Sequence, residues 1–273
     1  MRPMPTLELE VGSAILRFGP AGQPLTTSAV NVEERSVRRR SGLRAVAADP
    51  SAAAGGAVQY WMWNGVAEAE RVAELSRRAI RFELTSMADR PLGDERPKTS
   101  GHLHVRPALG RPIYPEVCQV LAGTAGFLVQ DLGPGPSASY AALVVVGPGE
   151  WVILPPGLHH GTVNLAGDPL VFADVIARRA TAGYAGLAAA HGFAHYILAD
   201  GSTIPNPAYR DVPSLERITA LEWSGLGSGA IYDTFVGDSE AFPWLQEPEM
   251  FATAFPDLAE RIRPVLGRMG EPL

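Results

Sequence analysis

Between residues 99 and 177 the chain consists of short apolar segments separated at regular intervals by turns rich in glycine and proline. Each segment is too short for a helix and has the length of an ordinary strand. Closely spaced strands joined by such turns are typical of β-sandwiches and β-barrels. We therefore expect an all-β core, with strands at residues 102–105, 117–122, 126–131, 141–146, 151–154, 161–164 and 170–176.

The segments on either side of this core are less regular. Alternation of apolar and polar residues over 7–18 predicts an early strand or hairpin, and we also expect strands at 59–64 and 80–85. Helical spacing predicts helices over 66–78, 214–223 and 259–269. The stretch after residue 210 is too aromatic to be disordered. We expect an N-terminal extension (1–29), a barrel domain (30–209) and a C-terminal extension (210–273) that packs on the barrel or across a dimer interface.

The composition excludes several classes of function. The 273 residues are 46% hydrophobic and 19% charged, a balance typical of globular proteins, and the net charge of −6 argues against a nucleic-acid partner. No stretch approaches the roughly 20 apolar residues of a membrane span, and the N-terminus lacks the apolar region of a signal peptide. The single cysteine, Cys118, permits no internal disulfide. We expect a cytoplasmic protein that contacts neither membranes nor nucleic acids.

Three histidines and one glutamate form the clearest functional pattern. His102 and His104 are two residues apart on a predicted strand, so both imidazoles point to the same face. Glu116 opens the next apolar segment, and His160 follows a Pro-Pro-Gly turn. Mixed nitrogen and oxygen ligands suit a divalent transition metal such as Fe, Mn, Ni, Co or Zn. By strand alternation His159 faces away from His160, at the surface or behind the ligands.

These residues, in this order, resemble the two cupin motifs. Gly101-His102-Leu103-His104, with Glu116 and then Gly123, matches the first motif, and Pro156-Gly157-Leu158-His159-His160 with Asn164 matches the second. A wider set that includes Lys98-Thr99-Ser100 and Gly161-Thr162-Val163 is similar to the cupin-type phosphoglucose isomerases first known from archaea. The resemblance extends over about residues 30–209.

The resemblance implies a fold and an activity. The fold is a cupin double-stranded β-helix, a jelly-roll barrel that is usually dimeric, here with N-terminal strands and a partly helical C-terminal extension. The activity is the interconversion of glucose 6-phosphate and fructose 6-phosphate, a step of glycolysis and gluconeogenesis, with one divalent ion (Fe, Mn, Ni or Zn). By position, the metal ligands are His102, His104, Glu116 and His160, and the phosphate-binding residues are Thr85, Thr99, Gly101 and Tyr184.

Two further roles come from the residues themselves. Glu116 is the candidate catalytic base, because isomerisation needs a group that moves a proton between C2 and C1 of the sugar. A metal-assisted hydride shift would need no such base, and the sequence does not distinguish the two routes. Gln130 is the candidate for an additional barrel-lining contact to the substrate.

The chain also departs from the family. The loop over 105–115 is longer than expected, Cys118 stands where a tyrosine is common, and the short archaeal proteins have no counterpart of the tail after residue 210. These changes leave open a cupin isomerase or epimerase that acts on another sugar. They also leave open an Fe-dependent cupin oxygenase and a sugar-binding cupin without catalysis.

Overall fold

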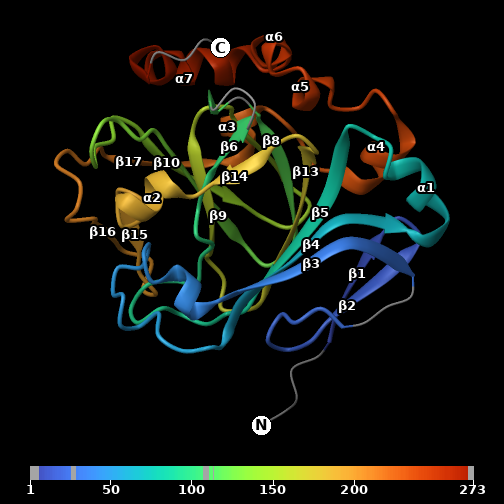
Figure 1. Cartoon of the computed structure of the whole chain (residues 1–273), viewed down its shortest axis with the longest axis horizontal. Coiled ribbons are helices and arrows are strands. Elements are labelled where there is room, and N and C mark those ends of the chain that lie inside the picture. The colour runs from blue at the N-terminus through green and yellow to red at the C-terminus, as the bar shows by residue number, and fades with distance from the viewer. Residues whose placement is uncertain (1–5, 26–28, 107–110, 113, 270–273) are drawn as a thin grey trace.

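The computed structural model describes residues 6–25, 29–106, 111–112 and 114–269. Five of the eleven residues of the 105–115 loop (107–110 and 113) therefore lie outside the described residues. The described part is mainly β-structure, with short helices concentrated towards the C-terminus (Figure 1). None of its helices is long and apolar enough to cross a membrane.

Two large sheets form the core. The six-stranded sheet has the order β11-β8-β13-β5-β4-β3 and the four-stranded sheet the order β12-β9-β10-β17. In chain order the strands of the first are β3 (Val30–Arg39), β4 (Val58–Glu68), β5 (Ile80–Met87), β8 (Glu116–Ala122), β11 (Trp151–Leu154) and β13 (Leu170–Ala177). Those of the second are β9 (Ala125–Gln130), β10 (Ala141–Val146), β12 (His159–Asn164) and β17 (Leu215–Thr219).

Smaller sheets complete the barrel and its edges. They pair β14 (Thr181–Gly183) with β6 (Leu103–Arg106) and β6 with β7 (Arg111–Pro112), and they form the hairpins β1 (Leu7–Val11) with β2 (Ala14–Phe18) and β15 (His195–Ile197) with β16 (Thr203–Pro205). In the described residues every pairing of strands is antiparallel except that of β10 with β17.

The two large sheets enclose the core of the barrel. Phe127 of β9 and Phe172 of β13 meet edge to face, with ring centroids 5.7 Å apart, so apolar side chains of both sheets interdigitate. Every residue of β9, β12 and β13 is buried, because one face of each strand lines the interior and the other is covered. The predicted all-β barrel with N-terminal strands and a partly helical C-terminal end is confirmed.

Most of the helices are short, and α7 is the longest described. They are the α-helices α1 (Val72–Leu75), α2 (Ala185–Ala189), α3 (Ala220–Ser224), α4 (Ile231–Gly237), α5 (Pro243–Gln246), α6 (Phe251–Ala254) and α7 (Pro256–Met269), and the 3-10 helices η1 (Arg40–Leu43), η2 (Ala69–Arg71) and η3 (Pro248–Met250). The helix predicted over 259–269 is confirmed as part of α7.

Two helix predictions were wrong at their N-terminal ends, for the same reason, while residues 69–75 and 220–223 are helical as predicted. Residues 66–68 extend β4 and pair with β3, and only four residues beyond them form α1. Residues 215–219 pair with β10 as β17, and α3 starts after Thr219, whose side chain forms a capping box with Glu222. In both places an available strand edge outweighed local helical spacing.

The chain beyond residue 210 contacts the barrel through its helices (Figure 1). The indole Nε1 of Trp223 in α3 donates to the carbonyl of Ile153 at 2.7 Å. The backbone N–H of Ile231, which opens α4, donates to Oε1 of Gln119 at 3.0 Å. Tail and barrel therefore share buried hydrogen bonds, while the domain boundaries at residues 29 and 209 remain predictions.

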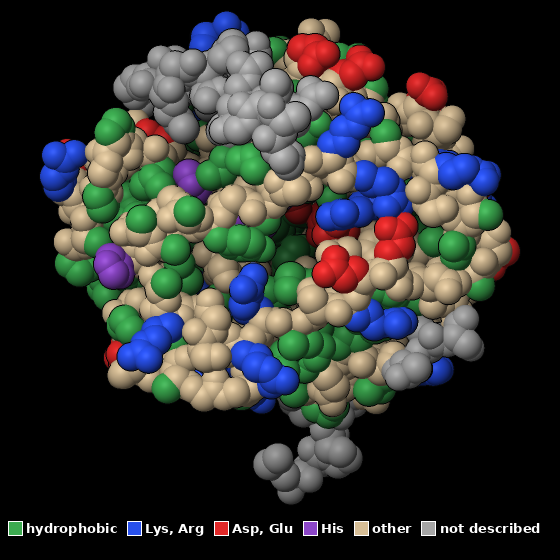
Figure 2. Space-filling view, in the orientation of Figure 1, with side chains coloured by type: hydrophobic (Ala, Val, Ile, Leu, Met, Phe, Trp, Pro, Cys, Tyr) green, Lys and Arg blue, Asp and Glu red, His purple; other side chains and the backbone are tan. Residues whose placement is uncertain are grey.

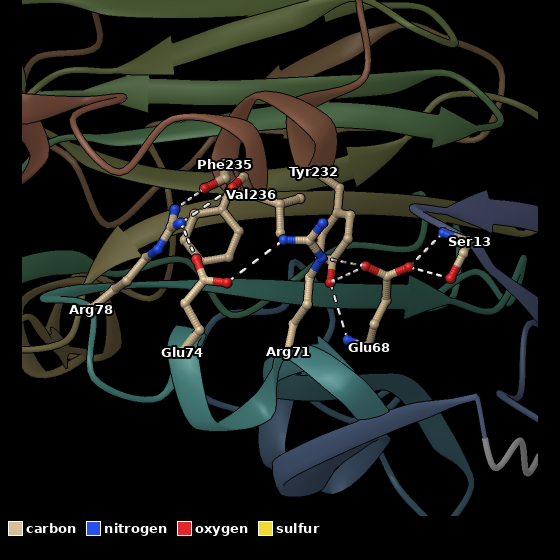
Figure 3. Close-up of polar contacts among 8 residues, drawn as sticks. All are labelled: Ser13, Glu68, Arg71, Glu74, Arg78, Tyr232, Phe235 and Val236. Atoms are coloured by element: carbon tan, nitrogen blue, oxygen red, sulfur yellow. Dashed lines mark hydrogen bonds and ion pairs between the residues drawn. The ribbon is translucent and has the colours of Figure 1, made fainter.

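Glu68 joins three segments of the chain (Figure 3). Its buried carboxylate accepts from the backbone N–H and the hydroxyl of Ser13 and pairs with Arg71 at 3.2 Å. The hydroxyl of Tyr232 accepts from the Glu68 N–H at 3.1 Å and lies 3.5 Å from its carboxylate. Burial would raise the pKa of Glu68, but the bonds from Ser13 and the charge of Arg71 hold it below its usual value.

We expect Tyr232→Phe to lower the free energy of unfolding by about 1–2 kcal/mol. The phenyl ring would keep its edge contact with Phe82, at a centroid distance of 4.9 Å, but the N–H of Glu68 would lose its acceptor. Urea denaturation measures the change. The control is Leu221→Ala, because this leucine is 60% exposed. Equal unfolding midpoints for Tyr232→Phe and the parent would contradict this account of how α4 is held.

Candidate metal centre

Backbone geometry brings the first histidine pair close to the last histidine. His102 and His160 form an isolated bridge in which each backbone N–H donates to the other's carbonyl, at 2.8 and 2.7 Å. Gly161 permits this approach, because a Cβ there would lie 3.0 Å from the Cα of Gly101. Gly101 is constrained by a different neighbour. Its φ is +69°, and a Cβ there would lie 2.5 Å from the ring of Phe193. No other residue type fits this position without displacing that ring.

The four predicted ligands converge. The imidazole centroids of His102, His104 and His160 are 4.6–4.8 Å apart, and Oε2 of Glu116 lies 3.2 Å from Nε2 of His160. One ligand atom from each of the four residues lies within 4.8 Å of the other three. Metal–ligand bonds of about 2.1 Å place neighbouring ligands about 3 Å and opposite ligands about 4 Å apart. The four side chains therefore converge to nearly the spacing that a single ion requires, and small side-chain rotations would close the difference.

Three polar atoms at the centre lack a hydrogen-bond partner in the described part of the chain. Nδ1 of His104, Oε2 of Glu116 and Nε2 of His160 are buried without a hydrogen bond in the described structure. Nε2 of His102 faces Nε2 of His104 at 2.8 Å. Buried polar atoms without partners are costly and rare, and several in one place indicate a missing ligand. A divalent ion would satisfy these lone pairs together, so the residues present fit a metal.

The protonation states favour metal binding as well. Burial, together with the positive charge of neighbouring histidines, holds the pKa values of His102 and His104 well below the usual range. Neutral imidazoles keep the lone pairs that a metal needs. Oε1 of Glu116 accepts from the thiol of Cys118 at 3.3 Å, which leaves Oε2 directed at the histidines. Burial raises the pKa of that thiol, so it remains a hydrogen-bond donor.

A cavity of about 170 Å³ opens onto the four ligands. A bound water needs about 10–15 Å³ by the same measure, so the cavity has room for a small organic molecule. Figure 2 shows a hollow on the face viewed, bordered by acidic and basic side chains. The candidate phosphate-binding residues Thr85, Thr99, Gly101 and Tyr184 all line the cavity.

Gln130 lies apart from this set. Its side-chain amide donates to the hydroxyl of Tyr209 at 2.8 Å, and its carbonyl accepts from the N–H of Ala194 at 2.8 Å. It is buried and does not contribute to the lining of the cavity. The structure thus gives the Gln130 side chain partners within the protein.

Sequence reasoning missed several polar residues around the cavity. Arg38 is half-buried: its Nε donates to the hydroxyl of Tyr60 at 3.3 Å, and its guanidinium lies 5.3 Å from the centroid of the Tyr184 ring. Glu83 and Asp174 face the cavity from neighbouring strands. Alternation along each strand could have assigned each residue to the inner face of its own strand. Only the pairing of β5 with β13 brings the two residues together.

The acidic residues make the cavity electrostatically suited to a cation. Burial, opposed by the charge of Arg81, raises the pKa of Glu83 to about 7. Burial and the charges of Glu83 and Glu116 raise the pKa of Asp174. Carboxylates that share a buried space resist ionisation unless a positive charge is near. A divalent ion at the four ligands would supply such a charge.

His159 is not at the surface. It faces away from the cavity, as strand alternation predicts, but it is buried beneath α2, where a Cβ on Gly186 would lie 2.9 Å from its Nε2. Neither ring nitrogen has a hydrogen-bond partner in the described structure. Burial and the neighbouring His160 lower the pKa of His159 to about 4.

The fold and the site together define a β-barrel protein with an interior site suited to a metal. A family model described as glucose-6-phosphate isomerase (GPI) matches residues 37–214. The match covers well over half of the chain, which therefore belongs to this family, and the predicted cupin resemblance is confirmed. No curated protein matches the chain.

Solved structures with some likeness are cupin enzymes of other kinds. An oxalate decarboxylase from Bacillus subtilis, in a structure at pH 4.6, is 18% identical over 43% of this chain and 25% of its own, with a TM-score of 0.31. The Lactobacillus farciminis oxalate decarboxylase formate complex is 20% identical over 43% and 28%, with a TM-score of 0.31. The polyketide cyclase RemF from Streptomyces resistomycificus is 19% identical over 46% and 66%, with a TM-score of 0.29. The chain thus spans less than a third of the decarboxylases' length.

His160→Ala should lower metal affinity at least 100-fold, because it removes one of four ligands and opens the centre to water. Metal content after dialysis, measured by mass spectrometry, reports the loss. The matched control is His159→Leu, which removes the adjacent imidazole outside the ligand set and should leave metal content intact. Equal metal content in His160→Ala and the parent would mean that the four residues do not bind the ion together.

The buried His159 should make the fold sensitive to acid. The unfolded chain takes up a proton below about pH 6.5, but the folded protein does so only near pH 4, so stability falls as the pH decreases between these values. At pH 5 the difference amounts to about 2 kcal/mol. His159→Leu should reduce the stability lost between pH 8 and pH 5 by about that amount in urea titrations. A loss as large as that of the parent would show that this imidazole ionises freely in the folded state.

Proposed function

We propose that the chain is a metal-dependent aldose–ketose isomerase of a sugar phosphate, with glucose 6-phosphate and fructose 6-phosphate as the leading pair. The observation that carries the proposal is the coincidence of the family match with four converging ligands in a cavity large enough for a small molecule. Family membership supports the reaction class, and the polar lining of the cavity supports the substrate class.

Hydroxyl and backbone donors in the cavity suit a phosphate group. Thr85 and Thr99 both face the cavity. The Thr99 oxygen already accepts from the N–H of Thr162 at 2.9 Å, so its own proton is free to be donated to a ligand. Tyr184 is 41% exposed and carries the guanidinium of Arg38 over its ring. Arg38 thus adds a positive charge at the edge of the cavity, where it would attract a phosphate.

Isomerisation moves one hydrogen between C2 and C1 of the sugar. A bound divalent ion would stabilise the negative charge that develops on O1 and O2. Glu116 would take the proton from C2 and return it to C1, while the hydroxyl proton passes between the two oxygens. The thiol of Cys118 fixes the carboxylate through Oε1, so Oε2 keeps its orientation towards the histidines. Burial of the centre excludes bulk water from the intermediate.

The metal-loaded protein should convert glucose 6-phosphate to fructose 6-phosphate, with loss of activity in chelator and recovery on re-addition of metal. Glu116→Gln should lower kcat by about 10²–10⁴-fold, the usual contribution of a general base. Metal content, measured in parallel, separates loss of the base from loss of the ion. Unchanged kcat in a metal-loaded Glu116→Gln would favour a hydride shift. No turnover of any hexose phosphate by the loaded parent protein would overturn the proposed function.

A further inference from the structure

The register of β5 and β13 arranges cavity-lining residues in rows. Arg81, Glu83 and Thr85 alternate along β5 and all face the cavity. On β13 the opposite residues are Ile176, Asp174 and Phe172, in that order, and they face the cavity as well. Successive rows along a strand are about 7 Å apart. The pair Glu83 and Asp174 therefore forms the middle row of three.

The middle row lies between the metal centre and the predicted phosphate end. Cys118 of β8 is paired with Asp174, and Val117 with Val175, so Glu116 lies at the level of Ile176, in the first row. Thr85 belongs to the third row, opposite Phe172. A sugar phosphate with its reacting carbons at the metal and its phosphate at Thr85 would extend past Glu83 and Asp174.

Within the described residues Asp174 has no hydrogen-bond or ion-pair partner, although the charge of Arg81 acts on it. Its exposed fraction is 5%, yet within the described residues its carboxylate makes no hydrogen bond or ion pair, while it faces the cavity. The neighbouring Glu83 pairs with Arg81. The equally buried Asp131 accepts from the N–H groups of Ser139 and Tyr140 at 2.8 and 2.9 Å. A buried carboxylate without partners destabilises the fold, so its retention points to a ligand.

We propose that Asp174, supported by Glu83, is a specificity-determining residue that accepts hydrogen bonds from hydroxyl groups on the substrate carbons between the reacting end and the phosphate. This inference rests on the proposed function for the direction in which the sugar lies. Carboxylates bind hydroxyl groups as acceptors and repel phosphate, so the middle row selects a polyhydroxyl chain there. The described residues grouped by their spacing as metal ligands are His102, His104, Glu116 and His160, so Asp174 remains available to the substrate.

The test measures binding, so it does not depend on turnover. Glucitol 6-phosphate has the hydroxyl chain and the phosphate but no carbonyl group, and so it cannot isomerise. Calorimetric titration of the metal-loaded parent with glucitol 6-phosphate and its 3-, 4- and 5-deoxy analogues gives the contribution of each hydroxyl. We expect at least one deoxy analogue to bind about tenfold more weakly, because it leaves a buried acceptor without a partner.

Asp174→Leu should weaken binding of glucitol 6-phosphate about tenfold. It should also remove the discrimination against the deoxy analogue that binds weakly to the parent. Metal content should remain unchanged. Asp174→Asn, which keeps one acceptor oxygen, should retain part of the discrimination. The control Asp131→Asn should leave the discrimination intact, because Asp131 lies outside the cavity lining. Asp174→Leu should also keep or raise the parent's melting temperature, since no protein group loses a partner, whereas Asp131→Leu should lower it.

The outcomes separate this inference from the proposed function. Discrimination in Asp174→Leu equal to that of the parent would overturn the inference and leave the isomerase proposal standing. Failure of the loaded parent to bind glucitol 6-phosphate would overturn the inference as well. Selective binding that depends on Asp174, together with no isomerisation of hexose phosphates, would support the inference and remove the proposed reaction.

Discussion

The structure depends on the convergence of three imidazoles and one carboxylate, of which His104, Glu116 and His160 are buried and His102 is partly buried, around a single point. Nδ1 of His104, Oε2 of Glu116 and Nε2 of His160 have no hydrogen-bond partner in the described structure, and the pKa values of His102 and His104 are held low by burial. Such a cluster destabilises an ion-free barrel, and one cation would satisfy it in a single step. The backbone bridge between His102 and His160 serves this convergence, and Gly161 allows it, because a Cβ at 161 would lie 3.0 Å from the Cα of Gly101.

Part of the site could be predicted from the sequence because its ligands lie in local patterns. His102 and His104 share a face because strand side chains alternate, and Glu116 and His160 lie next to turns that the glycines and prolines reveal. The strands between residues 117 and 176 were predictable because each is short and apolar, whereas β3, with ten largely polar residues, was not predicted. Local spacing failed at residues 66–68 and 215–219, where pairing with β3 and β10 decided the conformation. Such pairings join residues that are far apart in the sequence, so a local sequence pattern does not reveal them.

The acidic pair Glu83 and Asp174 could not be predicted from local sequence patterns either. Residues 83 and 174 are far apart in the chain, and their meeting depends on the register between β5 and β13. A shift of one residue would turn Asp174 away from the interior. Their proximity also creates mutual repulsion, since burial and the neighbouring carboxylates raise the pKa values of both. Arg81 relieves this repulsion on one side, and a cation held by the four ligands would relieve it on the other.

Burial alone does not distinguish structural from functional carboxylates in this barrel. Asp131 and Asp174 are exposed to almost the same small extent, 4% and 5%. Asp131 is enclosed by hydrogen-bond donors from the following turn, so the fold itself accounts for its presence. Asp174 has space in front of it and no donor within the described protein, and a fold selected for stability alone would have replaced it with an apolar residue. Whether a buried polar atom has hydrogen-bond partners, more than how deeply it is buried, therefore indicates where this barrel contacts a ligand.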